Sequence, residues 1–571
     1  MHVRQAPRRG AKSVGKRLVV AAFFLALALI ANAPHIWFHR GAPSFDLMVH
    51  YRWSMDVARA MAAGDPWPHW MPTASLGLGE PALLYYAPLY YLLSGLIQQV
   101  TGNTWAAMHV VEVAASFGCG WFAWALVRDY TGGRGALVAG VLAVLSPMAI
   151  MLNHGFNGFP WVVAFAPVSY LFWAMLRSRA FGQAINLHAM VALALVLCTH
   201  TISGLMCMLC LAPLAFVGAD GRLRVEPRRI VAVCGVFVGG LLLAAIYFWP
   251  AVAYRPLIDE AVFKTRFTPW DAFVLPTFTA RMYGMKWFAL QVPIPLVTFG
   301  VAALGAFVLL HGGANEAQRR LGLSGALMLG VAAFFALEPS YPLWRLDTPL
   351  RYIQFPFRLT AIAAVVLPVL VGVALGVSTR APRWSRSVLI AGAAASVVLA
   401  LAILAQTSTQ GRLLAVETDR LTPYPGLPEY RTSTRGAGWH GYVDAGLLPG
   451  ECRRLELTCS VATRDGAGFR WRIATDHATE VRLPLFEFPA FVAAIDGREV
   501  PHRRDDATGL VMVTLPPGAH DVYMHWRSLP AERAGLFLSI FTAIVLATLA
   551  LVFPGWRVNA RASITDERIC A

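Results

Sequence analysis

Residues 83–100 read LLYYAPLYYLLSGLIQQV, and whether this apolar run crosses the membrane decides the orientation of everything that follows it. A crossing would place five basic stretches outside the cell, whereas Lys and Arg accumulate in cytoplasmic loops. Pro88 interrupts a helix in the middle of the run, and the tyrosines around it favour the headgroup region of a bilayer. We therefore expect the run to lie at the outer interface, as a juxtamembrane or re-entrant helix. The basic stretches that then face the cytoplasm are residues 128–135, 177–183, 220–229, 311–320 and 378–386.

The composition is that of a polytopic α-helical membrane protein. Hydrophobic residues make up 57% of the 571 residues, and charged residues make up 14%. The net charge of +16 is concentrated in short clusters between apolar runs, a pattern that indicates cytoplasmic loop anchors and argues against nucleic-acid binding. Both termini are expected in the cytoplasm. Twelve spans near the ~20 residues that a bilayer core requires are predicted at residues 18–38, 103–127, 135–152, 158–176, 183–199, 201–218, 229–251, 291–311, 321–337, 357–377, 387–405 and 534–553.

The predicted orientation leaves two long exported segments. Residues 39–102 form the first exported loop of a transmembrane domain that covers residues 1–405. Residues 406–532 contain alternating or apolar runs between turn signals such as DG and PPG, which predicts a small exported β-rich domain, resembling a sandwich. Residues 533–571 complete the chain as the final transmembrane helix and a cytoplasmic tail.

The cysteines offer one pairing to test. Cys452 and Cys459 lie in the predicted β-rich domain, whereas five of the eight cysteines lie in apolar runs. An exported location permits a disulfide between the two. The alternative, two free thiols, stays open at this point.

The first exported loop begins with a segment of helical periodicity that carries polar residues close together. Asp46 and His50 are four residues apart, which places the carboxylate and the imidazole on the same side of a helix, with Trp53 beside them to stack on a sugar ring. Asp56 points elsewhere and is expected to pair with arginines of the same helix at the surface. The opposite side is an apolar stripe, which indicates an amphipathic helix along the membrane surface: Leu47, Met48, Tyr51, Met55, Ala58 and Ala62.

Several stretches together resemble a known family. They are FDLMVHYRW (45–53), GLGEPALLYYAPLYYLLSG (77–95), RYIQFPFRL (351–359) and, in the β-rich domain, FEFPAFVAAIDGREV (486–500). In this order they resemble a family of bacterial membrane proteins labelled as related to 6-pyruvoyl-tetrahydropterin synthase. That family is similar to the GT-C glycosyltransferases, integral membrane enzymes that move a sugar from a polyprenyl-phosphate carrier to an acceptor on the outer face. The resemblance implies a GT-C-like fold of the bacterial cytoplasmic (inner) membrane and no pterin chemistry.

The resemblance also points to site residues. GT-C enzymes place an acidic residue in the first exported loop, a position that Asp46 occupies, and a carboxylate there can act as general base on the acceptor hydroxyl. Arg358 lies near the predicted start of a span, where it and free backbone N–H groups can meet the leaving phosphate. Relatives tend to carry a glutamate near the fourth span, where this chain reads HGFNGFPW (154–161), so a second acidic group is not expected there. The substrate-binding candidates are His50, Trp53, Glu80, Tyr85, Tyr86, His200, Arg351 and Arg358.

Each candidate also has a structural interpretation. Asp46 could only cap the helix that follows it, and His50 could only hydrogen-bond Asp46. Arg358 could reach lipid headgroups. His200 could be a buried turn residue, and Glu80 a solvated loop carboxylate. The tyrosines could simply anchor the chain at the interface.

The expected activity is an inverting transfer from a polyprenyl-phosphate-linked sugar to an envelope glycan, lipid or protein. No Walker-type loop, dinucleotide fingerprint or Cys/His zinc spacing competes with it, and a divalent cation such as Mg or Mn is left open. Two alternatives remain. A transporter or flippase of lipid-linked saccharides predicts charged or broken helices at the bilayer midplane. A non-catalytic scaffold predicts that residues 406–532 bind envelope glycans.

Overall fold

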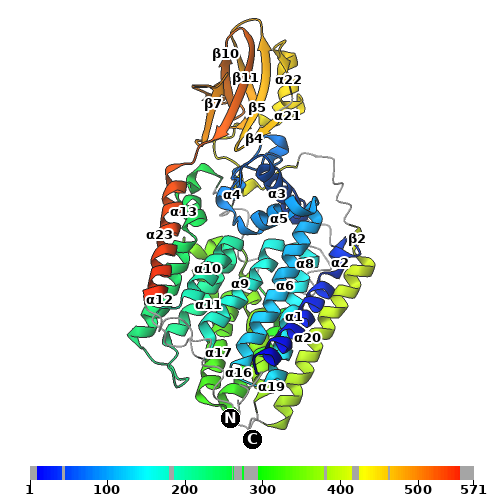
Figure 1. The fold of residues 1–571 in the computed structure, drawn as a ribbon, viewed down its shortest axis with the longest axis vertical. Helices are drawn as coiled ribbons and strands as arrows, with labels where there is room; N and C mark the ends of the chain where they lie inside the picture. The colour runs from blue at the N-terminus through cyan, green and yellow to red at the C-terminus, as the bar shows by residue number, and fades with distance from the viewer. Residues whose placement is uncertain are drawn as a thin grey trace, which may run out of the picture.

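The computed structural model describes residues 9–41, 45–178, 185–259, 262, 273–274, 293–377, 382–413, 424–460 and 463–552. Figure 1 shows three layers along the longest axis: a helical bundle, a layer of short helices at one end of it, and a β domain beyond that layer.

The bundle helices agree with the predicted spans in position. Within the described residues, nine helices are long and apolar enough to cross a membrane. α12 and α13 form a further candidate that is bent by 79°, and α10 and α11 are shorter apolar helices, so all twelve predicted spans have a counterpart. The bounds are α1 Arg9–Ala31, α6 Thr104–Arg128, α7 Gly133–Val144, α8 Pro147–Phe156, α9 Phe159–Leu176, α10 Leu187–Thr199, α11 Thr201–Leu211, α12 Pro227–Leu243, α13 Ala245–Ala253, α16 Pro293–His311, α17 Glu316–Ala336, α19 Thr360–Gly376, α20 Arg383–Gln410 and α23 Pro530–Val552.

The predicted non-crossing segment belongs to the layer of short helices. It is broken at Pro88 into α4 (Ala82–Tyr85) and α5 (Leu89–Thr101). The 13 residues of α5 extend about 20 Å, which is too short for a hydrocarbon core of about 30 Å. In Figure 1, α4 and α5 lie beside α3 (Phe45–Ala62), between the bundle and the β domain. The chain is therefore a multi-pass membrane protein with a helical layer outside its spans.

Of the three polar-side residues predicted for α3, Asp46 is exposed, but His50 and Trp53 are buried. Residues 49–58 are all buried, and Trp53 is 0% exposed. The residues that would face water are covered by α5 and by the segment that precedes the β domain, because Tyr430 packs its ring 6.0 Å from that of Trp53. The tyrosines of α5 are not interface anchors either, since Tyr90 and Tyr91 are both 0% exposed. Helical periodicity could not show that a second layer covers this helix.

Asp56 is likewise not part of a surface ion pair. It is 1% exposed and accepts hydrogen bonds from the backbone N–H of Thr73 at 3.2 Å and from its Oγ1 at 2.7 Å. Burial raises the pKa of Asp56 to about 6, although both bonds from Thr73 lower it. The expected structural role is confirmed, with the loop after α3 as the partner.

The β domain consists of two antiparallel sheets, which confirms the predicted β-rich C-terminal region. One sheet has the order β6-β10-β9, and the other has the order β3-β5-β11-β7-β8 with β4 paired to β5. The predicted start at residue 406 is too early, because α20 continues to Gln410. Two helices, α21 (Trp439–Asp444) and α22 (Leu447–Arg454), precede the strands. The strands are β3 Thr458–Cys459, β4 Thr463–Asp465, β5 Gly468–Thr475, β6 Thr479–Phe486, β7 Phe491–Ile495, β8 Arg498–Val500, β9 Arg503–Arg504, β10 Leu510–Leu515 and β11 Gly518–Trp526.

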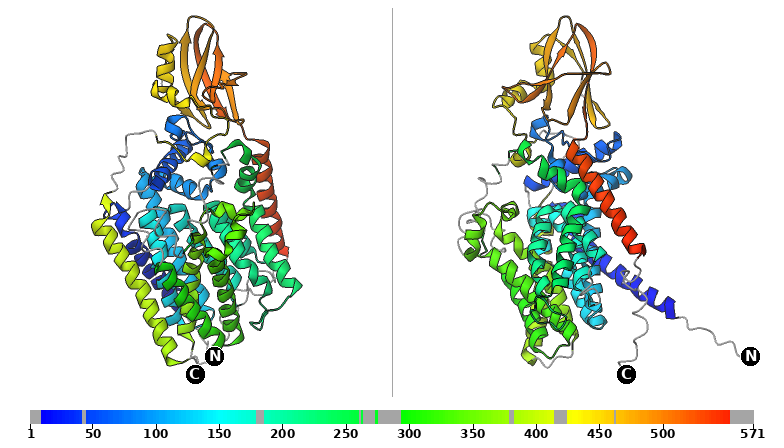
Figure 2. Two further views of the ribbon diagram at one scale, coloured as in Figure 1. Left: turned by 180° about the vertical axis from the view of Figure 1, so that it is seen from behind. Right: turned by 90° about the vertical axis from the view of Figure 1, so that its left-hand side faces the viewer.

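The last helix joins the β domain to the bundle. Figure 2 shows α23 descending from the β domain along the outside of the bundle, where it packs on α13. Ser539 accepts a hydrogen bond from the backbone N–H of Ile246 at 2.8 Å. A Cβ added to Gly535 would lie 2.3 Å from the carbonyl oxygen of Ala245. The close approach of the two helices therefore requires glycine at this position.

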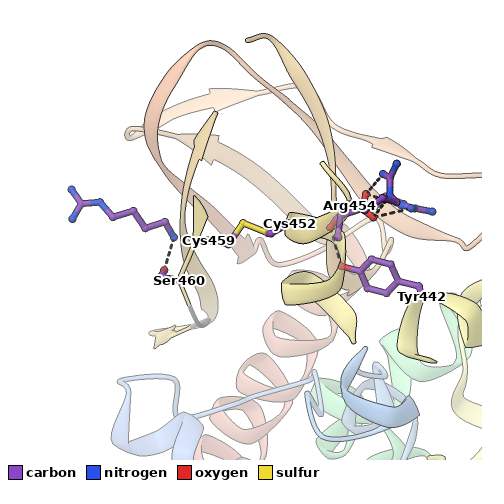
Figure 3. The surroundings of a disulfide bond; sticks show 8 residues. Tyr442, Cys452, Arg454, Cys459 and Ser460 are labelled. Atoms are coloured by element: carbon purple, nitrogen blue, oxygen red, sulfur yellow. Dashed lines mark hydrogen bonds and ion pairs between the residues drawn. A yellow bond between two sulfur atoms is a disulfide. The ribbon is translucent and has the colours of Figure 1, made fainter. Parts of the chain in front are cut away.

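Cys452 and Cys459 form a disulfide, which settles the pairing that the sequence left open. Figure 3 shows that it links the end of α22 to β3, on the side of the domain that carries Arg454 and Tyr442. The bond joins residues with a sequence separation of 7, a loop for which chain entropy gives a stabilisation of about 2.5 kcal/mol.

We expect reduction of this disulfide to raise the susceptibility of the β domain to limited proteolysis by up to about 50-fold, because its opened form becomes more populated. The measurement is the cleavage rate of the full-length protein with and without reductant. A variant with both cysteines replaced by serine should cleave fast and be insensitive to reductant. Equal rates for the reduced and oxidised wild type would contradict the expectation.

Candidate active site beneath the β domain

Asp46 lies in the first turn of α3, outside the membrane-spanning helices, and its side chain is exposed. Within the described residues, no hydrogen bond to its carboxylate is found, and Ser44, which precedes α3 at the cap position, lies outside them, so the capping interpretation stays open. Desolvation by the surrounding protein is the largest effect on the pKa of Asp46 and raises it to about 6; Arg358 opposes this rise and Glu429 adds to it. Because solvent reaches the side chain, it screens part of these effects. Asp46 is thus a carboxylate that solvent can reach, with a guanidinium nearby.

Arg358 is held in place by its own loop and by aromatic rings. It lies in the 3-10 turn Pro356–Leu359 directly before α19. Its guanidinium donates to the carbonyl of Ile353 at 3.1 Å and to Oε1 of Gln354 at 2.8 Å. Gln354 has a φ of 66°, a strained value for a residue other than glycine. The guanidinium also lies over the ring of Trp161, with 5.4 Å from its carbon to the ring centroid.

His200 is connected to Arg358 through Trp161. Its ring stacks on that of Trp161, with centroids 5.9 Å apart and an angle of 13° between the planes. It also caps α11: its Nδ1 accepts from the backbone N–H of Ser203 at 3.2 Å and lies 2.8 Å from Ser203 Oγ. His200 is 5% exposed. Both the buried turn role and the position near Arg358 therefore hold for this residue.

His50 does not pair with Asp46 as the spacing of four residues predicted. Its Nδ1 lies 2.7 Å from the hydroxyl of Tyr91, deep in the layer of short helices. The indole of Trp53 is directed to the hydroxyl of Tyr424. Both partners come from segments far away in the sequence, so helix spacing alone could not identify them.

Tyr85, the last residue of α4, and Tyr86, which follows it, have different surroundings. Tyr86 is half-buried, and its phenol pKa is raised by burial and by the charge of Asp46. Tyr85 is buried, and its hydroxyl donates to the carbonyl of Tyr254 at 2.8 Å, while its own carbonyl accepts from Tyr247 at 2.8 Å. Tyr86 therefore belongs to the surroundings of Asp46, whereas Tyr85 ties α4 to α13.

Glu80 is not a solvated loop carboxylate, because it is 0% exposed. It accepts hydrogen bonds from Ser75 Oγ at 2.6 Å and from the backbone N–H of Leu427 at 3.3 Å. A Cβ added to Gly426, whose φ is +71°, would lie 2.0 Å from Glu80 Oε1. Glu80 thus fastens the first exported loop to the segment that leads into the β domain.

This burial gives a stability prediction. Desolvation raises the pKa of Glu80 to about 8, although Ser75, Arg431 and Leu427 lower it, while the ordinary value is 4.5. The folded protein keeps the proton that the unfolded chain releases, so the stabilising contribution is complete below about pH 4.5 and is lost as the pH rises through about 8. Between these pH values the free energy of unfolding of the wild type should fall, relative to that of Glu80→Gln, by up to about 1 kcal/mol per pH unit. We therefore expect the Tm of the wild type to fall relative to that of the variant. Parallel Tm profiles of the two proteins in detergent would contradict this.

Arg351 lies on the same loop as Arg358 but has a different partner. Its guanidinium donates to the carbonyl of Arg345 at 3.0 Å, within the segment that precedes α19. Within the described residues, no contact is found between Arg351 and Asp46, Tyr86 or Trp161. Of the two arginines proposed from sequence, Arg358 is therefore the one that lies near enough to Asp46 to lower its pKa.

Two members of this site were not identified from the sequence. Trp161, at the start of α9, lies between Arg358 and His200, and Glu429 lies near enough to Asp46 to raise its pKa. The aromatic residue after Pro160 was a usable signal, since it marks the start of a helix at the outer side. Glu429 lies 340 or more residues after the acidic residues of the first exported loop, and no motif surrounds it in the sequence. Nothing in the sequence therefore indicated that it lies near Asp46.

The described residues contain one group that could hold a metal ion, formed by His35, His109 and Glu112. All three are buried, inside the bundle rather than at Asp46. The divalent cation that the sequence left open thus has a possible set of ligands, at a place where none was expected.

Comparison with known proteins identifies a family and several distant structural relatives. Residues 83–412 match the model of a family described as a 6-pyruvoyl-tetrahydropterin synthase related domain of membrane proteins. No curated protein sequence matches the chain.

The structural relatives are solved membrane enzymes. ArnT from Cupriavidus metallidurans bound to undecaprenyl phosphate is 15% identical with a TM-score of 0.42, over 67% of this chain and 63% of that one. The mycobacterial arabinofuranosyltransferase AftD is 14% identical with a TM-score of 0.37, over 75% of this chain and 28% of that one. The Archaeoglobus fulgidus oligosaccharyltransferase in its apo form is 14% identical with a TM-score of 0.36, over 69% and 56%. The match spans less than two thirds of each of these proteins, and the likeness is too loose to transfer a substrate or a residue role.

Proposed function

We propose an activity for this chain, which belongs to the 6-pyruvoyl-tetrahydropterin synthase related family of membrane proteins: it transfers a sugar from a polyprenyl phosphate to an envelope acceptor at the outer face of the cytoplasmic membrane. The observation that carries the proposal is that Arg358 lies close enough to Asp46 to lower the pKa of its carboxyl. A carboxylate that solvent can reach lies outside the spans, and a positioned guanidinium at the first turn of the span Pro356–Gly376 is near enough to lower its pKa, on the side of the bundle that faces the β domain. The GT-C-like pattern of the sequence supports the same activity.

Each of the two groups has a defined part in such a transfer. The acceptor hydroxyl gives its proton to the Asp46 carboxylate while its oxygen attacks the anomeric carbon of the donor. The bond between that carbon and the phosphate oxygen breaks from the opposite side, so the configuration inverts and polyprenyl phosphate leaves. Arg358 stabilises the negative charge that develops on the phosphate, since a guanidinium can donate two parallel hydrogen bonds to it. Its existing bonds to Ile353 and Gln354 hold it in orientation before the donor arrives.

The neighbouring aromatic residues fit the binding of a sugar. Tyr86 and Trp161 lie beside Asp46 and Arg358 respectively, and flat rings stack on the apolar faces of sugars. His200 lies behind Trp161 and supports its ring by stacking. We assign these residues to positioning of the donor.

The orientation is part of the proposal. With both termini in the cytoplasm, the basic loops between the spans face the cytoplasm and the β domain is exported. The arrangement of Figure 1 supports this, because the loops that connect α6 to α7 and α16 to α17 lie at the end of the bundle opposite the β domain. Asp46 and Arg358 then meet the outer leaflet, where a lipid-linked sugar is presented.

The test is an assay of the purified protein with a panel of polyprenyl-phosphate sugars, in which release of polyprenyl phosphate is measured. We expect release from at least one donor when an acceptor fraction from the envelope is present. A flippase would move the donor between leaflets of a proteoliposome without cleaving it. Movement without release for the whole panel would contradict the proposal.

The rate of this transfer should depend on the protonation of Asp46. Only the ionised carboxylate can accept a proton, so activity is lost as the pH falls through the pKa of Asp46, which is raised to about 6. We expect initial rates to rise about tenfold per pH unit below that pKa and to level off above pH 7. The measurement is the pH profile of kcat/KM between pH 4.5 and 8. A flat profile over this range would exclude Asp46 as the base.

A further inference from the structure

A second polar cluster lies inside the bundle, and the proposed transfer does not use it. It consists of His35, which is on the short helix α2 (Ala33–Ile36), and of His109 and Glu112 of α6. Their exposed fractions are 0%, 4% and 0%. Nδ1 of His35 lies 3.5 Å and Nδ1 of His109 lies 3.1 Å from Oε2 of Glu112. A carboxylate so deeply buried costs several kcal/mol unless a positive charge accompanies it.

The hydrogen bonds of His154 determine which nitrogen of His35 carries a proton. His154 Nε2 lies 2.8 Å from the carbonyl oxygen of Ala31, which can only accept, so this nitrogen donates. The other nitrogen of the neutral His154 ring then accepts from His35 Nε2 at 3.2 Å. In a neutral His35 ring, Nδ1 is consequently left with a lone pair that faces the Glu112 carboxylate. Two such acceptors repel each other unless a cation, either a proton or a metal ion, lies between them.

The distances favour a metal ion. A proton shared between an imidazolium and a carboxylate brings the two heavy atoms to about 2.7–2.9 Å. Ligands about 2.0–2.2 Å from a tetrahedral Zn²⁺ are instead about 3.3 Å apart. The 3.5 Å between His35 Nδ1 and Glu112 Oε2 is close to this value and too long for a hydrogen bond between charged groups, whereas the 3.1 Å between His109 Nδ1 and Glu112 Oε2 fits both a ligand pair and a neutral hydrogen bond. In the described part of the chain, Oε1 of Glu112 and Oδ1 of Asn153 are buried without a hydrogen-bond partner. These oxygens are available to a metal ion or to a water bound to it.

We infer that His35, His109 and Glu112 bind one divalent transition-metal ion, and that Zn²⁺ is the ion that this set of two imidazoles and one carboxylate fits best. The second oxygen of Glu112, or a water held by Asn153, completes the coordination. One ligand atom from each of the three residues lies within 4.8 Å of the others, so small side-chain movements close the site.

The ion would support the layer that carries Asp46. The ring of Phe159 lies 5.7 Å from that of His35 and 5.9 Å from that of His50 of α3, so the metal site and α3 pack against the same phenyl ring. The ion also ties α2 to α6. Its role is structural, and the inference does not depend on the proposed transfer.

The test uses full-length protein purified in detergent without a polyhistidine tag, with its metal content measured by inductively coupled plasma mass spectrometry. We expect about one equivalent of zinc per wild-type chain and less than about 0.2 in His109→Ala and in Glu112→Gln, because each variant removes one of three ligands. His69→Ala is the matched control. It removes a histidine whose Nε2 lies 2.6 Å from Oε1 of Glu532, a pair outside the cluster, and should leave the zinc content unchanged.

A second measurement decides the case if the variants do not fold. Addition of a chelator to the wild type should lower its Tm, Zn²⁺ should restore it, and Co²⁺ should give the visible absorption of a tetrahedral site. The inference is wrong if the wild type binds less than about 0.1 equivalent of zinc after incubation with Zn²⁺ and if the chelator does not change its Tm. A proton would then occupy the cluster. Full metal content in folded His109→Ala and Glu112→Gln would also overturn the inference, since other residues would then bind the ion.

Discussion

Asp46→Asn should lower kcat for sugar transfer by about 10³-fold, within the range of 10²- to 10⁴-fold that a positioned general base supplies. Asn keeps the size of the side chain and cannot accept the proton of the acceptor hydroxyl. Because the Asp46 side chain is exposed and accepts no hydrogen bond among the described residues, the exchange should leave the Tm nearly unchanged. The measurement is single-turnover transfer by the variant, together with its Tm.

The matched control is Asp444→Asn, which changes an exposed aspartate at the end of α21 in the β domain. It should transfer at the wild-type rate. Asp46→Glu should retain a measurable fraction of the activity, since the carboxylate remains but is displaced by one methylene. Wild-type turnover by a folded Asp46→Asn protein would show that another group accepts the proton.

Arg358→Gln should lower kcat by about 10²- to 10³-fold, which is the loss that follows removal of one preorganised donor to a developing negative charge. Arg358→Lys should recover part of this, because it restores the charge without the two parallel hydrogen bonds. The variant should also bind the donor more weakly, since the phosphate carries negative charge before the reaction as well. Single-turnover rates at saturating donor, and the KM for the donor, separate the two effects.

Arg351→Gln is the comparison for this pair of arginines. The Arg351 guanidinium donates to the carbonyl of Arg345 and lies on the same loop, so a loss of less than about threefold is expected, as for other surface charges. Equal losses for Arg351→Gln and Arg358→Gln would show that general positive charge, rather than the position beside Asp46, matters.

The sequence was sufficient to predict the membrane spans, the strands of the β domain and the family. Each of these predictions depends on a local pattern. The spans follow from apolar runs long enough for a bilayer, the strands from alternating or apolar runs between turn residues, and the family from short stretches that resemble it in the same order. The segment around Pro88 was placed correctly for the same reason, because the proline and the positions of the basic loops are local signals.

The surroundings of α3 could not be predicted in this way. Asp46 and His50 share a helix side by spacing, yet His50 reaches Tyr91 and Trp53 reaches Tyr424, because the layer of short helices and the segment before the β domain close over α3. Glu80 looked like a loop carboxylate for the same reason. Burial of polar groups by a distant part of the chain leaves no periodic trace in the sequence.

The metal-ligand candidates were missed for a related reason. His109 and Glu112 are three residues apart on one helix, but the third member, His35, lies more than seventy positions earlier, so no spacing motif joins them. No acidic residue was expected in HGFNGFPW (154–161), yet Glu112 of α6 lies next to the start of this stretch, with its Oε2 3.5 Å from Nδ2 of Asn153.

The most direct test of the central claim is the binding of polyprenyl phosphate, the product common to every sugar donor, measured by native mass spectrometry of the detergent-released protein. The wild type and Asp46→Asn should both bind polyprenyl phosphate and discriminate against the uncharged polyprenol, whereas Arg358→Gln should lose most of that preference. Equal binding of the phosphate and the alcohol, or an unchanged preference in Arg358→Gln, would contradict the assignment of this site to a lipid-phosphate sugar.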